Sequence, residues 1–198
     1  MKKKILLNGI VVGEYEATGN VDEDIVGVRT FLKNRGLWKE LSSNDAMFAQ
    51  ANSFAEIANS VYSKDLKHSP YKGSAVAPFV VNACFAIEIY LKTILETQGQ
   101  SSKEHNLDKL FGELDGDSTR IVEVAAQDVR PRYTLPEKST FRSGLSELSS
   151  AFVQWRYLYE HERLSTELQS IRFTMHTLFE AACRAREECA KQCAALTN

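Results

Sequence analysis

The chain of 198 residues contains few prolines and few glycines. Four prolines and ten glycines leave little room for the many turns of an all-β domain, so the composition favours helices. The 24 lysines and arginines nearly balance the 26 aspartates and glutamates, and the net charge of −2 excludes a protein that coats nucleic acid by bulk attraction. With 43% hydrophobic residues the chain is too apolar for wholesale disorder and long enough to form a core without disulfide bonds.

Targeting segments and long hydrophobic runs are also lacking. After the basic residues 2–4, the apolar run from Ile5 ends at Leu7, before Asn8 and Gly9, and this is too short for a secretory signal peptide. We find no stretch that approaches the roughly 18 apolar residues of a membrane span. The sequence therefore predicts a cytoplasmic protein with no membrane partner and with reduced cysteines.

The four cysteines fall into two groups. Cys84 lies among apolar residues and is expected to behave as a small hydrophobic side chain of the core. Cys183, Cys189 and Cys193 share one helical pattern near the C-terminus, without the close cysteine pairs and the fourth ligand of a zinc site. We expect free thiols, no metal and no cofactor, with zinc binding as the alternative.

The first forty residues differ from the rest of the chain. Residues 3–7 and 10–15 are β-prone runs around Asn8-Gly9, a pair typical of a tight hairpin turn. A helix should follow, with acidic residues 22–24 at its start and Gly36 just beyond its end. Because an isolated hairpin is marginally stable, this appendage should dock on the rest of the chain, on a second copy or on a partner.

Residues 41–198 are dominated by helical periodicity. Apolar residues at helical spacing predict a series of helices, the first of them capped by Asn44. The expected helices cover residues 44–62, 78–95, 106–114, 118–129, 141–155 and 165–182. The predicted fold is mainly α, an up-and-down helical bundle with a small N-terminal β-hairpin appendage.

Common catalytic signatures are absent from the sequence, including glycine-rich phosphate loops, H-E-x-x-H and G-x-S-x-G. Glu88 and Lys92 are spaced for a helical salt bridge, which lies either on the surface or at the rim of a cleft. His105, at a helix start, is expected to pack or cap there, and His176 is expected to fill space at the surface or in the core.

Residues 152–161 form the most informative segment. Its Arg156 and His161 are five residues apart, which places them about 140° apart on a straight helix. They converge only if the helix ends between them. Alternatively, Arg156 pairs with Glu160 and His161 is exposed.

Basic residues exceed acidic residues by three between Arg130 and Arg156. Together with Tyr133 and Phe141, these charges could form a platform for the phosphates and bases of single-stranded RNA. A solvated loop with scattered charges is the alternative. The candidate arginines are Arg130, Arg132 and Arg142.

Three short motifs together resemble the HEPN family. Residues 86–92 and 105–110 are similar to its E-x-x-L-K helix and the following H-x-L-x-x-L turn and helix. Residues 155–161 stand where the family carries its Arg–His motif. The resemblance covers about residues 45–185 and does not include the N-terminal appendage.

The resemblance implies a homodimeric, all-α bundle in which two Arg–His motifs meet across a cleft. Active HEPN proteins are metal-independent endoribonucleases of toxin–antitoxin, phage-defence and RNA-processing systems. Arg156 would then bind the scissile phosphate and His161 would act as general acid or base, with the 2′-hydroxyl as nucleophile. The residues assigned to substrate binding are Tyr157, Arg130, Arg132, Arg142, Glu88 and Lys92.

One residue departs from the pattern of active HEPN members. Tyr157 follows the arginine, where active members place a small polar residue. The alternative is therefore a non-catalytic HEPN module that binds RNA, a nucleotide or a cognate protein partner such as an antitoxin.

Overall fold

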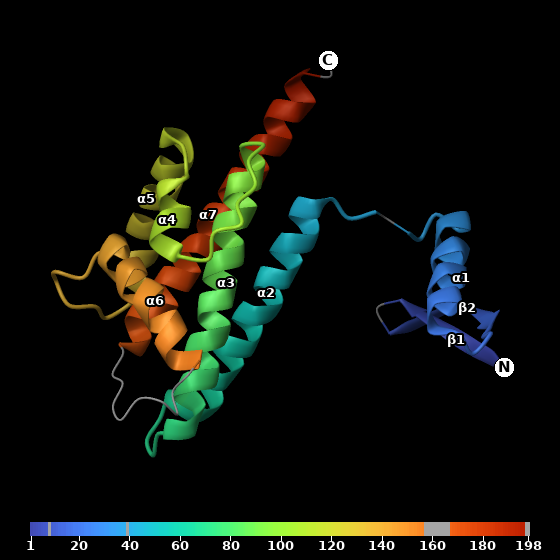
Figure 1. Cartoon of the computed structure of the whole chain (residues 1–198), viewed down its shortest axis with the longest axis horizontal. Coiled ribbons are helices and arrows are strands. Elements are labelled where there is room, and N and C mark those ends of the chain that lie inside the picture. The colour runs from blue at the N-terminus through green and yellow to red at the C-terminus, as the bar shows by residue number, and fades with distance from the viewer. Residues whose placement is uncertain (8, 39, 157–166, 197–198) are drawn as a thin grey trace. The chain divides into compact units, whose positions relative to one another are not determined.

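The computed structural model describes residues 1–7, 9–38, 40–156 and 167–196, without the side chains of residues 150–156 and 196. The protein is mainly helical (70% helix) and carries a two-stranded N-terminal hairpin (Figure 1). The predicted helical class and the predicted hairpin are therefore confirmed. Contacts divide the chain into two units, Met1–Ser42 and Ser43–Asn198.

The N-terminal unit consists of one hairpin and one helix. Strands β1 (Lys2–Leu7) and β2 (Ile10–Glu16) pair antiparallel, and Gly9 has the positive φ of +80° that a tight hairpin turn requires. Helix α1 (Val21–Asn34) begins at Asn20, whose side chain accepts a hydrogen bond from the amide of Asp22. Local turn and capping chemistry thus accounts for these elements.

Few side chains hold the N-terminal unit together. Ile5 and Leu32 are its buried hydrophobic residues, and Phe31 packs directly on the backbone of Gly13. A Cβ atom at position 13 would overlap the Phe31 ring. The glycine therefore lets α1 lie close to the hairpin.

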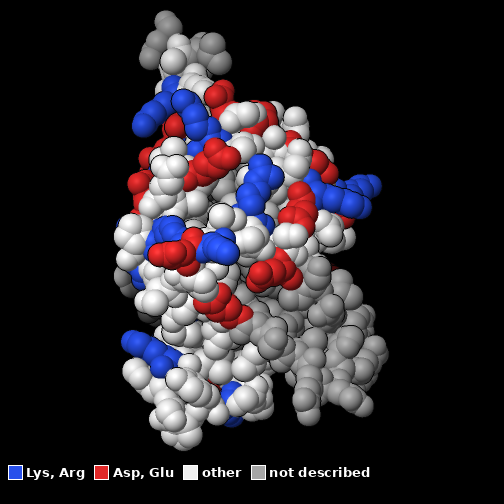
Figure 2. Space-filling view, turned by 90° about the vertical axis from the view of Figure 1, so that its left-hand side faces the viewer, with Lys and Arg blue, Asp and Glu red and all other residues white. Residues whose placement is uncertain are grey.

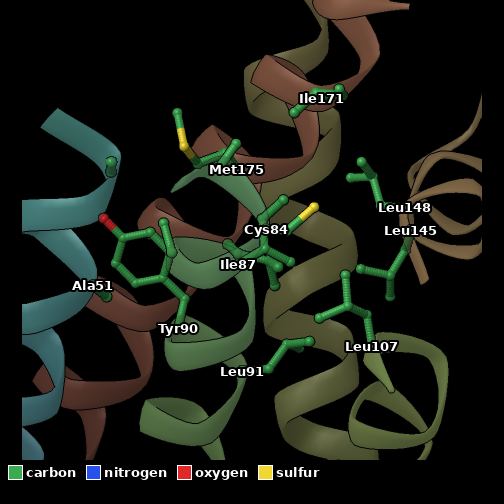
Figure 3. Close-up of a cluster of buried hydrophobic side chains, with 14 of the residues drawn as sticks. Ala51, Cys84, Ile87, Tyr90, Leu91, Leu107, Leu145, Leu148, Ile171 and Met175 are labelled. Atoms are coloured by element: carbon green, nitrogen blue, oxygen red, sulfur yellow. The ribbon is translucent and has the colours of Figure 1, made fainter. Parts of the chain in front are cut away.

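The second unit is a bundle arranged around one central helix. Helix α3 (Val76–Thr97) contacts α2 (Ser43–Val61), α4 (Leu107–Gly112), α6 (Phe141–Arg156) and α7 (Leu168–Leu196). Helix α5 (Gly116–Val129) packs against α7. Figure 3 shows side chains of α3 meeting those of its neighbours in the core. Cys84 is fully buried there, as the sequence predicts.

The segment Gly73–Thr97, which includes α3, is long and apolar enough to span a membrane by length and composition alone, with a hydropathy of 1.7. The expectation that no such stretch exists is therefore wrong, since the segment meets these criteria despite the charged residues Glu88 and Lys92. In the bundle, 56% of the apolar 18-residue window within this segment is buried inside the protein. Its place as the core helix accounts for its apolar composition.

Small residues allow two close helix contacts. Ala51, Ala55 and Ala58 are buried residues of α2, the helix that packs most extensively on α3. On α6, Gly144 faces α7, where an added Cβ would lie 2.9 Å from Ser170 Oγ. These positions set how closely the helices approach one another.

Asn44 has a different role from the predicted cap. Helix α2 begins at Ser43, so Asn44 lies inside the helix. Its Nδ2 donates to the carbonyl oxygen of Thr93 at 2.9 Å, and its Oδ1 accepts from Arg186 Nε at 2.8 Å. The side chain therefore links α2 to both α3 and α7.

Candidate functional site

A buried carboxylate lies on the central helix. Glu88 is 6% exposed, and its Oε1 lies 2.9 Å from Lys92 Nζ and 3.0 Å from Nδ1 of His105. The salt bridge that the spacing of Glu88 and Lys92 predicts is present, but the surface alternative is wrong, because the packing around α3 removes Glu88 from solvent. Through its contact with His105, Glu88 also connects α3 to the turn that precedes α4.

That turn is held by a second carboxylate. Glu104 Oε1 accepts from the backbone amides of Asn106 and His105 at 3.0 and 2.9 Å, and its Oε2 lies 3.3 Å from Lys109 Nζ. The hydrogen bonds from the Asn106 and His105 amides, followed by that of Lys109, lower the pKa of Glu104 to about 2. Asn106 caps α4 by accepting from the Lys109 amide. The turn therefore fixes the backbone that carries His105.

The imidazole of His105 is oriented by Glu88. A carboxylate accepts hydrogen bonds, so Nδ1 of His105 is the donor and Nε2 is the nitrogen left for other partners. The His105 side chain is 74% exposed. A carboxylate that fixes a histidine tautomer is the arrangement that general bases use.

Helix α6 is tied to the same region. Ser149 Oγ accepts from the backbone amide of Asp108, in the first turn of α4, at 2.9 Å. Helix α6 is described as far as Arg156. The side chain of Arg156 and the whole of Tyr157 and His161 lie outside the described residues, so the catalytic pair stays a prediction.

The candidate arginines are divided between two places, since Arg130 and Arg142 line one depression whereas Arg132 lies beside His176 and Glu180. Arg130 Nη1 donates to the carbonyl oxygen of Ser139 at 2.6 Å and its Nη2 to that of Pro136 at 3.1 Å, so Arg130 holds the loop that follows α5. The guanidinium of Arg142 lies 4.2 Å from the centre of the Phe111 ring.

Acidic residues accompany these basic residues. A depression of about 400 Å³ is lined by Arg130 and Arg142 but also by Glu123 and Glu137. Figure 2 shows the side of the molecule that lies to the left in Figure 1, where basic and acidic residues are interspersed over the described surface. This face therefore offers no extended basic path among the described residues.

A polar cluster joins the segment after α5 to the last helix. His176 Nδ1 lies 3.1 Å from the hydroxyl of Tyr133, and its Nε2 lies 3.4 Å from Arg132 Nη1 and 3.5 Å from Glu180 Oε1. Burial, followed by the charge of Arg132, lowers the pKa of His176. His176 is thus a neutral, hydrogen-bonded member of a cluster at pH 7, rather than a residue that only fills space.

Arg172 stands beside this cluster. Its guanidinium lies 4.1 Å from the centre of the Tyr62 ring and 5.4 Å from that of Tyr133, and Nη1 donates to Gln169 Oε1 at 3.4 Å. The sequence interpretation did not select Arg172. The spacing of Gln169, Arg172, His176 and Glu180, a polar stripe on one helical face, could have identified it.

A groove of about 640 Å³ opens between α2 and α7, with Tyr90 of α3 among its lining residues. Its walls combine aromatic, amide and charged side chains, a combination found in small-molecule sites. The lining residues are Asn52, Ala55, Glu56, Asn59, Ser63, Tyr90, Tyr133, Arg172, Met175, His176 and Phe179.

Groups that could hold a metal ion are absent from the described part of the chain, where no three His, Cys, Asp or Glu side chains come together. The zinc alternative for Cys183, Cys189 and Cys193 therefore lacks a ligand set among these residues. Comparisons of the chain with models of protein families, with curated proteins and with solved structures find no match.

Proposed function

We propose that the helical unit is a HEPN-like domain that cleaves RNA without a metal ion, as a homodimer, in a toxin or defence context. Arg156 and His161 are the proposed catalytic residues. The proposal combines the resemblance of the three motifs with the way the described parts of those motifs are joined.

The supporting observation is that three segments far apart in the sequence are joined by hydrogen bonds. Glu88 on α3 binds His105, which precedes α4. The amide of Asp108 in α4 binds Ser149 of α6, the helix that carries Arg156. A site built from all three motifs requires such an arrangement, because its residues must be held at fixed separations.

The reaction divides between the two catalytic residues. The guanidinium of Arg156 would bind two oxygens of the scissile phosphate and neutralise the charge that develops there. His161 would take the proton of the 2′-hydroxyl as the 2′-oxygen attacks phosphorus, or protonate the departing 5′-oxygen. The P–O5′ bond breaks, leaving a 2′,3′-cyclic phosphate and a 5′-hydroxyl. Buried Glu88 would act as a positioning residue that orients the imidazole of His105.

The test is cleavage of labelled single-stranded RNA and transfer RNA by the full chain in EDTA. Arg156→Ala and His161→Ala should each lower the rate by roughly 100-fold or more. His68→Ala and Arg120→Ala, at exposed positions of a loop and of α5, are the matched controls and should retain full activity. Undiminished cleavage by both catalytic variants would refute the proposal.

A second candidate is a non-catalytic HEPN-like module that binds RNA, a nucleotide or a cognate protein. One observation favours it, namely that Tyr157 directly follows the arginine, where active HEPN members place a small polar residue. In that case RNA is bound but not cleaved, and binding survives His161→Ala. Substitution of Arg130, Arg132 and Arg142 should then weaken binding.

A further inference from the structure

Side-chain contacts join α2 and α7 at both ends of the groove that lies between them. Arg186 of α7 pairs with Asp45 at the start of α2, whereas Arg172 stacks on Tyr62 just after the end of α2. The two helices therefore run antiparallel. Both pack extensively on α3 but touch each other little, which leaves the space between them open.

The interior of the groove suits a flat ring. The Tyr90 hydroxyl donates to Asn52 Oδ1 at 2.7 Å, and the Tyr90 ring meets Phe179 edge-on at 5.9 Å. Burial raises the pKa of Tyr90, so this hydroxyl stays a donor at all ordinary pH values. Figure 3 shows Tyr90 between α2 and α7, with Met175 nearby. Tyr90 and Met175 are themselves buried and form the floor of the groove, whereas the partly buried rings of Phe179 and Tyr133 offer aromatic surface to a planar ring.

The far end of the groove carries the positive charge of Arg172, which an anionic ligand would complement. Arg172 is held by the rings of Tyr62 and Tyr133 and by Gln169, and within the described residues no carboxylate forms an ion pair with it. Its Nε is buried with no hydrogen-bond partner among those residues. A partly buried cation without a counter-ion is costly, and an oxyanion at this guanidinium would offset that cost.

The neighbours of Arg172 limit the charge of the ligand. His176 has a lowered pKa and is neutral at pH 7, and the charge of Arg132 is shared with Glu180 at 4.0 Å. Tyr133 contributes a hydroxyl. This end of the groove therefore offers the single charge of Arg172 beside neutral hydrogen-bonding groups, while the α2 side carries the carboxylate of Glu56. One anionic group at Arg172 fits this arrangement, whereas a polyanion would be repelled by Glu56.

The side of the groove formed by α2 carries polar side chains that can form hydrogen bonds with the polar edge of a ring. Asn52, Glu56 and Asn59 line the groove from successive turns and supply amide donors and carboxylate acceptors. Such groups bind the N–H and C=O edge of a heterocycle or a ring hydroxyl.

We propose that this groove binds a small planar ring that carries a single anionic group. A nucleoside monophosphate and an aromatic carboxylic acid share this chemistry, and the choice of probe distinguishes them. The proposal goes beyond RNA cleavage and does not rest on it, because none of the contacts from which it is argued involves Arg156 or His161.

The test is calorimetric titration of the full chain with each of the four common nucleoside monophosphates, with indole-3-acetate and with 4-hydroxybenzoate. At least one probe should bind, with inorganic phosphate alone binding more weakly. Arg172→Met should weaken binding by roughly 10-fold or more, since it removes charge-assisted hydrogen bonds. Arg184→Met, on the same helix but paired with Asp128, is the matched control and should bind as the parent does.

Asn59→Trp provides a second test that is independent of Arg172. Asn59 is exposed at the edge of the groove, so a tryptophan there should block entry without disturbing the core. Loss of binding in this variant supports the proposal even if Arg172→Met fails to fold. Failure of every probe to bind at millimolar concentration, or undiminished binding in Asn59→Trp, would overturn it. Arg156→Ala should bind the probe normally, which separates this proposal from RNA cleavage.

Discussion

The pairing of Glu88 with Lys92 leads to a prediction about stability. Glu88 is 6% exposed and the Lys92 side chain is 17% exposed, so removal of either partner leaves a charge that is largely withdrawn from water. Breaking a fully buried pair costs about 3–5 kcal/mol. Because Lys92 retains some solvent and His105 remains beside Glu88, we expect about 2–3 kcal/mol for Glu88→Leu or Lys92→Leu alone.

Replacing both residues removes the charges together. The double variant Glu88→Leu/Lys92→Leu should lose much less than the sum of the single losses, with a coupling of about 1.5 kcal/mol or more. The assay is urea unfolding of all four proteins, followed by far-ultraviolet circular dichroism. The exposed pair Asp117 and Arg120 is the control, and its coupling should be near zero. Additive losses at Glu88 and Lys92 would refute the reasoning.

Three further predictions concern single residues. Gly144→Ala should destabilise the bundle by about 1–2 kcal/mol in urea unfolding, because the added Cβ crowds α7 by more than the gain in helix propensity offsets. The pKa of folded His176 lies below the ordinary 6.5, so the unfolded chain binds this proton more readily, and stability should fall as the pH drops below 6.5. His176→Gln should lose less stability between pH 7 and pH 5. The folded pKa of Glu104 is about 2 against an ordinary 4.5, so its stabilising effect should be present above pH 4.5 and lost between pH 4.5 and pH 2. A carboxyl NMR titration of the wild-type chain, with Glu104→Gln to assign the resonance, measures this pKa directly.

The helices could be predicted from the sequence because their buried faces repeat every three to four residues. Helix α3 is the clearest example, since one stripe from Phe79 to Leu95 is buried against its neighbours. The expected helix over residues 44–62 ends within one residue of the end of α2 at Val61. The π-helical turn that follows at residues 62–66, with Tyr62 and Leu66 buried, could not be predicted in this way.

The polar clusters were harder to predict because they depend on contacts between distant segments. The spacing of Glu88 and Lys92 is visible in the sequence, but the burial of Glu88 depends on how α3 packs with its neighbours and on His105. Likewise, the hydrogen-bonded role of His176 depends on its contact with Tyr133, which lies 43 residues earlier in the sequence. Periodicity reports which face of a helix is apolar, and it does not report what lies opposite a polar residue.

The two proposed sites should respond differently to dilution. Catalysis that needs Arg156 and His161 from two chains is lost when the dimer dissociates, so the specific cleavage rate should fall as the protein concentration drops below the dimer Kd. The described lining residues of the groove all belong to a single chain, and the affinity of its ligand should stay constant over the same range. Sedimentation velocity at each concentration relates both readouts to the oligomeric state. Cleavage that is independent of concentration while the protein is monomeric would contradict the dimeric site and leave the groove unaffected.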